Sequence, residues 1–152
     1  MTFAVVLDTC VLYPAHLRDS LLRLTESGLY RALWSADIIE ELQRNLIGVA
    51  GPSAVGHLLG QMTAAFPDAE VAGYQSLIEG LTCDPKDRHV LAAAVRANAG
   101  AIVTFNTSDF PNHSVEPFAL EVVHPDTFLL DLLDLAPGVV IGELTRQASA
   151  NR

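Results

Sequence analysis

The stretch that decides the fold is Cys83-Asp84-Pro85-Lys86-Asp87-Arg88-His89-Val90-Leu91-Ala92-Ala93-Ala94-Val95, followed by Gly100-Ala101-Ile102-Val103-Thr104-Phe105-Asn106-Thr107-Ser108-Asp109-Phe110. Asp84 is a good N-cap residue, and Pro85 has the fixed φ that suits the first helical position. A helix is therefore expected to begin here, with Gly100 as its stop, and the apolar residues 101–105 have strand chemistry. A helix closely followed by a strand predicts a parallel α/β sheet.

Polar side chains follow the predicted strands where ligands bind in such sheets, beyond the carboxyl ends. Asn106 and Asp109 follow the strand at 101–105, and Asp8 ends the apolar run 2–7, which is typical of a strand buried on both faces. In a parallel sheet Asp8, Asn106 and Asp109 converge at one edge, and Asp87 joins them from its helix start. The alternative role for Asp8 is to cap a turn together with Thr9.

The remaining pattern predicts a single domain over residues 1–152, with a central, mostly parallel sheet flanked by helices. Its 50% hydrophobic composition is ample for one core. Further strands are expected at residues 30–34 and 120–123, and residues 69–72 fit an edge strand. Further helices are expected to open near Pro14, Ser35, Ser53, Pro125 and Pro137, and residues 74–81 fit a helical turn.

Composition excludes several classes of protein. No apolar run reaches the roughly 18 residues of a membrane span, and the start lacks a basic n-region, so we expect a cytoplasmic protein without a membrane segment. Cys10 and Cys83 fit neither a disulfide scaffold nor a zinc site. The net charge of −9 argues against a broad electrostatic grip on nucleic acid. Acids can instead serve solubility, or a cluster of them can hold a divalent cation that bridges to phosphate.

The converging oxygen side chains favour a site for a divalent cation over a role in solubility. Carboxylates that lie close repel one another unless a cation neutralises them, and Mg²⁺ or Mn²⁺ binds a few carboxylates together with waters and substrate phosphates. The reaction class this indicates is metal-assisted hydrolysis of a phosphodiester. No Gly-x-Ser-x-Gly elbow supports a serine nucleophile. His89 and Lys86 can approach the site or contact phosphate, but packing or a surface position is an alternative for each.

Four motifs in this order resemble the PIN domain family, closest to single-domain bacterial proteins similar to VapC toxins. They are residues 6–12, residues 35–42 with paired glutamates, residues 84–92 and residues 102–111. The resemblance extends to residues 125–128. It implies a Rossmann-like fold, a ribonuclease dependent on Mg²⁺ or Mn²⁺ that cleaves RNA, a homodimer, and a cognate antitoxin that inhibits it.

The resemblance also assigns site residues. The family's acids fall on Asp8, Glu41, Asp87 and Asp109, as catalytic residues and metal ligands. Thr104 matches the residue that helps to order the site. Asn106 stands where many members have an aspartate, so it offers an amide oxygen but no charge.

The choice between the adjacent Glu40 and Glu41 rests on two arguments. Residues advance by about 100° along a helix, which places Glu41 nearer than Glu40 to the buried stripe of Ile38 and Leu42. In the resembling family the functional glutamate directly precedes a leucine, as Glu41 precedes Leu42.

Competing interpretations remain. A haloacid-dehalogenase-like phosphatase needs an aspartate where Cys10 stands, and both it and a receiver domain need a site lysine that Lys86 does not match. A binding module for RNA or protein on a PIN-like scaffold, weak or inactive as an enzyme, remains the alternative function because of Asn106.

Overall fold

The computed structural model describes residues 3–151 and has a five-stranded sheet at its centre. The sheet order is β3-β2-β1-β4-β5, and every neighbouring pair is parallel, which confirms the predicted fold class. The strands are β1 Ala4–Leu7, β2 Arg31–Ser35, β3 Glu70–Val71, β4 Ala101–Val103 and β5 Glu121–Val123. Thr2, which was expected to start the first strand, lies outside the described residues.

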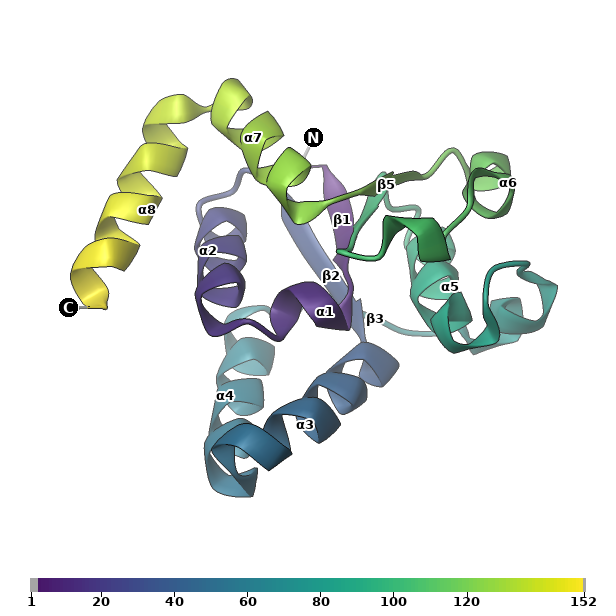
Figure 1. Cartoon of the computed structure of the whole chain (residues 1–152), viewed down its shortest axis with the longest axis horizontal. Coiled ribbons are helices and arrows are strands. Elements are labelled where there is room, and N and C mark those ends of the chain that lie inside the picture. The colour runs from purple at the N-terminus through teal and green to yellow at the C-terminus, as the bar shows by residue number, and fades with distance from the viewer. Residues whose placement is uncertain (1–2, 152) are drawn as a thin grey trace.

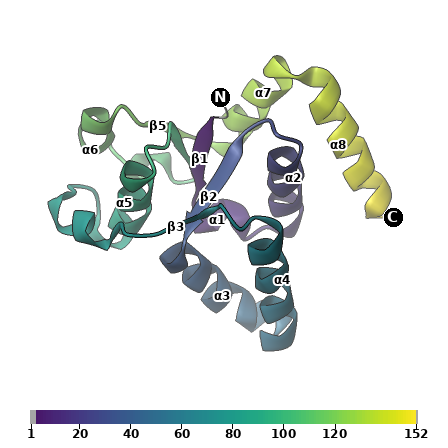
Figure 2. The same cartoon turned by 180° about the vertical axis from the view of Figure 1, so that it is seen from behind.

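Helices cover both sides of this sheet. They are α1 Thr9–Leu12, α2 Ala15–Glu26, α3 Ala36–Ala50, α4 Pro52–Ala65, α5 Arg88–Arg96, α6 Asn112–Val115, α7 Pro125–Leu135 and α8 Pro137–Ala150. In two opposite views α2 and α5 lie on opposite sides of the strands, and α8 lies outside α2 (Figures 1 and 2). In the described part of the chain, no helix combines the length and hydrophobicity needed to cross a membrane.

Short 3₁₀ helices fill several connections that periodicity does not resolve. They cover Gln75–Gly80, Pro85–Asp87, Thr107–Asp109 and Glu116–Phe118. The helix that the sequence predicts from Asp84 opens with the 3₁₀ turn Pro85–Asp87, in which Asp84 Oδ1 accepts from the backbone N–H of Lys86 at 3.1 Å. It ends earlier than Gly100, because Asn98 takes a left-handed conformation with φ 53°. Gly100 lies close to an aromatic side chain: a Cβ there would lie 2.2 Å from the ring of Phe3, so this exposed ring would have to shift.

The register of the central strands positions the site. Leu7 pairs with Val103 in β4, and both are fully buried, so β1 and β4 end level with each other. The Asp8 N–H then donates to the Val103 carbonyl at 3.1 Å. Asp8 and Thr104 are therefore the first residues beyond two adjacent strands. Helix α1 begins at this carboxyl edge of the sheet (Figure 1).

Candidate active site

Asp8 is held by two hydrogen bonds at the junction of β1 and α1. Its Oδ1 accepts from the Thr9 N–H at 2.8 Å, which caps α1, and its Oδ2 accepts from Thr104 Oγ1 at 2.9 Å. The side chain is only 8% exposed. Burial raises the pKa of Asp8, while the bonds from Thr104 and Thr9 oppose that rise. Asp8 thus fulfils the capping role and also faces the cavity described below.

Glu41 reaches the same region from α3. Ser35 caps this helix, with its Oγ accepting from the Ile38 N–H at 3.2 Å, and Ile38 and Leu42 are fully buried. Glu41 is half-buried beside this stripe and lines the cavity, whereas Glu40 is exposed and does not line it. The charge of Glu41 contributes to the raised pKa of Asp8, so the two carboxylates interact.

Asp87 lies at the start of α5. Burial, followed by repulsion from Asp109, raises its pKa from 3.8 to about 6, and a smaller repulsion comes from Asp8. Its Oδ2 is buried and has no hydrogen-bond partner within the described chain. A buried carboxylate oxygen without a partner is costly, so this atom is available to a cation or to a proton.

Asn106 and Asp109 come from the loop that follows β4. Asp109 is the last residue of the 3₁₀ helix Thr107–Asp109 and is half-buried. The Asn106 N–H donates to Thr104 Oγ1 at 3.1 Å, and Thr104 is fully buried. Thr104 therefore joins the backbone of this loop to Asp8, and the exposed Asn106 side chain stands on the cavity wall without adding charge.

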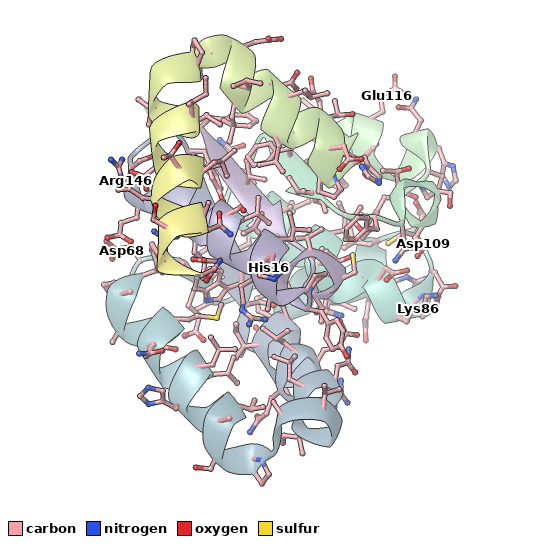
Figure 3. All side chains as sticks on the ribbon, turned by 60° about the vertical axis from the view of Figure 1, so that its left-hand side comes forward. His16, Asp68, Lys86, Asp109, Glu116 and Arg146 are labelled. Carbon is pink, nitrogen blue, oxygen red and sulfur yellow. The ribbon has the colours of Figure 1, made fainter. Side chains whose placement is uncertain are left out.

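These side chains line one cavity of about 610 Å³. Its lining residues are Asp8, Thr9, Cys10, Tyr13, Glu41, Asn45, Lys86, Asp87, Asn106 and Asp109. The four predicted acids, from four different segments, are therefore brought together, and so is Asn106. Lys86 and Asp109 are seen on the same flank of the molecule in Figure 3. Tyr13 and Asn45 were not assigned to the site from the sequence alone. Asn45 lies four residues after Glu41 on α3, and residues at that spacing lie on the same face of a helix, so this signal could have found it.

Cys10 and His89 complete the surroundings. Cys10 Sγ lies 3.4 Å from Thr104 Oγ1, and burial raises the pKa of its thiol, which disfavours the reactive thiolate form. His89 is half-buried, its Nδ1 has no partner within the described chain, and its charge would lower the pKa of Asp8. Both cysteines are free, as expected.

The side chains that line the cavity are of the chemical type that binds a hard divalent cation. The cavity offers carboxylate and amide oxygens, and Asp87, one of its lining residues, has a buried Oδ2 without a hydrogen-bond partner in the described chain. Among residues 3–151, however, no three acidic, histidine or cysteine side chains are grouped closely enough to hold one ion together. Mg²⁺ commonly keeps several waters and takes only one or two carboxylates besides substrate phosphates. The residues therefore suit a hydrated ion rather than a closed protein cage.

Comparison with known proteins places this site in a family. The PIN domain family model matches residues 4–108, which is more than half of the chain and includes every site residue except Asp109. One similar protein is named "Putative ribonuclease VapC50", from Mycobacterium tuberculosis, and is 52% identical over 63 residues. That match spans 41% of this chain and only 37% of the relative's length.

A solved structure supports the same fold. The crystal structure of VapBC2 from Rickettsia felis, bound to a DNA fragment from its promoter, contains a chain that matches with a TM-score of 0.53 at 17% identity. The match covers 80% of this chain and 98% of that one. At this identity the likeness concerns the fold alone. With the family model matching over most of the length, the chain belongs to the PIN domain family.

Proposed function

We propose that this protein is a metal-dependent endoribonuclease that hydrolyses RNA phosphodiester bonds. The observation that carries the proposal is the convergence of Asp8, Glu41, Asp87 and Asp109 in one cavity at the carboxyl edge of the sheet. Membership of the PIN family and the name of the ribonuclease relative support the substrate class. The ion proposed is Mg²⁺ or Mn²⁺, because most of the side chains that line the cavity offer carboxylate or amide oxygens.

The four acids and Asn106 would hold the ion directly or through water. A divalent ion bound there would supply an activated water and stabilise negative charge during attack on phosphorus. Thr104 fixes the orientation of Asp8, because its hydroxyl donates to Oδ2 while Thr9 N–H occupies Oδ1. Asp87 stays partly protonated near pH 6 without the ion, and an ion would favour its charged form.

The direct test is cleavage of a mixed RNA pool by the purified protein with Mg²⁺, with Mn²⁺ and with EDTA. We expect cleavage with either metal and none with EDTA. Asp8→Asn should abolish cleavage and keep the fold, whereas Asp68→Asn, an exposed acid away from the cavity, should cleave like wild type (Figure 3). Millimolar Mg²⁺ should also raise the melting temperature, and less so in Asp8→Asn. Retained cleavage by Asp8→Asn would remove Asp8 from the reaction.

A second candidate function is RNA or protein binding with weak or no catalysis. Two observations favour it: Asn106 supplies no charge, and the acids among residues 3–151 form no ready-made metal cage. Saturable RNA binding without cleavage at any tested Mg²⁺ or Mn²⁺ concentration would select this candidate.

Partners are proposed from the family. We propose a homodimer that is inhibited by a cognate antitoxin, as in a toxin–antitoxin pair. The VapBC2 complex and the VapC50 name support the antitoxin part of this proposal, and the homodimer is carried over from the resemblance to the family. Light scattering of the purified protein should give the mass of two chains. Co-expression with the neighbouring reading frame should yield a complex that no longer cleaves RNA, and an unaffected cleavage rate would argue against an antitoxin there.

A further inference from the structure

The cavity wall carries one cation among the acids. Lys86 is the only lysine in the 152 residues, and it lines the cavity together with Asp87 and Asp109. Lys86 is exposed, and its backbone N–H donates a hydrogen bond to the side chain of Asp84. Ion pairs in the described part of the chain join Arg23 to Asp19, Arg146 to Glu143 and His124 to Asp126, so Lys86 is in none of them. Burial raises the pKa of the neighbouring Asp87 and the positive charge of Lys86 opposes that rise, but the ammonium group forms no ion pair in the described chain and can meet an anion that enters the cavity.

The same cavity carries one exposed aromatic ring. Tyr13 follows α1 and is 39% exposed, although Leu12 before it is fully buried. Its backbone is held, because its N–H donates to the Thr9 carbonyl at 2.9 Å and Arg18 Nη1 donates to the Tyr13 and Leu12 carbonyls at 3.1 and 2.9 Å. A ring on a fixed backbone at the wall of a polar cavity can stack on a planar group at little entropic cost.

We propose that Tyr13 and Lys86 form a nucleotide subsite, in which the ring stacks on an unpaired base and the ammonium contacts an adjacent phosphate. This inference rests on the proposed ribonuclease function. The net charge of −9 argues against a broad electrostatic grip on RNA. Stacking does not depend on charge, so it is a source of affinity that suits this protein. A base inside a duplex has both faces covered, so the subsite selects unpaired RNA.

The test compares the binding of two fluorescent RNA probes of the same length, an unpaired oligoribonucleotide and a hairpin duplex. Binding of each is measured by fluorescence anisotropy in a buffer that contains Ca²⁺. Wild type should prefer the unpaired strand. Tyr13→Ala should weaken its binding by roughly fivefold or more, and Tyr13→Phe should restore it, since stacking needs the ring and not the hydroxyl. The matched control is Phe118→Ala, which removes a ring that is 38% exposed outside the cavity.

Lys86 is tested through salt dependence. Lys86→Gln should reduce the slope of log affinity against log salt by about 0.7, the loss of one phosphate contact on a single strand. The matched control is Arg146→Gln, an exposed charge on α8 at the opposite side of the molecule (Figure 3). Because Lys86 is the only lysine, its acetylation can be followed by mass spectrometry as one site, and bound RNA should protect it.

The outcomes separate this inference from the proposed function. Cleavage by wild type, with binding by Tyr13→Ala and Lys86→Gln within twofold of wild type, overturns the subsite and leaves the ribonuclease intact. Binding that depends on both residues without cleavage overturns the ribonuclease and leaves the subsite. Equal binding of duplex and unpaired RNA, or no RNA binding by wild type, overturns the subsite as well.

Discussion

Thr104 Oγ1 donates a hydrogen bond to Asp8 Oδ2 at 2.9 Å across 96 positions in the sequence. The bond joins the residues that follow two adjacent parallel strands, and both side chains are buried. The same hydroxyl oxygen accepts from the Asn106 N–H at 3.1 Å. One threonine thus sets the position of the acid that follows β1 and of the loop that carries two further cavity residues.

Replacing Thr104 by valine should therefore harm both stability and cleavage. Valine keeps the shape but leaves a buried carboxylate oxygen and the Asn106 N–H without this partner, which should cost about 1–3 kcal/mol in the free energy of unfolding. Thr104→Ser keeps the hydroxyl and should retain most of both properties. Urea denaturation and initial cleavage rates on the two variants decide the matter. A valine variant as stable and as active as the serine variant would argue that the hydrogen bond from Thr104 to Asp8 does not have this role.

The two adjacent glutamates of α3 provide a matched pair. Glu41→Gln should lower metal affinity and the cleavage rate by about tenfold or more, because Glu41 lines the cavity and interacts with Asp8. Glu40→Gln removes the same charge one position away on the exposed face and should change neither by more than a fewfold. The measurements are calorimetric Mg²⁺ titration and single-turnover cleavage. Damage from Glu40→Gln instead would mean that α3 is rotated from the arrangement described.

Asn106→Asp should tighten metal binding and lower metal-free stability. The new carboxylate would face a cavity that already holds four acids, so repulsion grows without metal and is relieved when metal binds. Gln43→Glu is the control, since it adds the same charge on the exposed surface of α3 outside the cavity. Melting temperatures in EDTA and in Mg²⁺ test the two halves of this prediction. An unchanged Mg²⁺ titration would place Asn106 away from the ion.

Much of this architecture follows from local patterns. The apolar run that ends at Asp8 marks the carboxyl end of a buried strand, and the stripe of Ile38 and Leu42 turns Glu41 toward the cavity and Glu40 toward solvent. Parallel strands bring their ends to one edge whatever the length of chain between them. The sequence therefore predicts which acids share the cavity.

Other features depend on contacts that no local pattern encodes. Tyr13 belongs to the cavity wall only because the four-residue helix α1 turns the chain back directly after Asp8. Asp109 lies in a three-residue 3₁₀ helix, which is too short to show periodicity. The spacing between the acids depends on these short connections. The predicted set of four metal ligands therefore gives the chemistry of the donors, but not whether three of them can reach one ion.

The last prediction concerns Asp87 and the pH dependence of stability in EDTA. Its pKa rises from 3.8 to about 6 in the folded protein, chiefly through burial and then through repulsion from Asp109. Between these values the folded protein keeps a proton that the unfolded chain releases. The free energy of unfolding should therefore fall as pH rises from about 4 to about 6, and this contribution is lost above that range.

Asp87→Asn cannot ionise, so it should lack this component. We expect the variant to melt above wild type at pH 7.5 in EDTA, with the difference shrinking toward pH 4, where the wild-type carboxyl is also neutral. In Mg²⁺ the order should reverse, because an ion stabilises only the carboxylate. Asp68→Asn, an exposed acid outside the cavity, controls for the loss of one surface charge. A difference in melting temperature between wild type and Asp87→Asn that stays constant from pH 4 to pH 7.5 would mean that Asp87 ionises normally in the folded protein. Burial of its carboxylate would then carry no penalty for a metal ion to relieve.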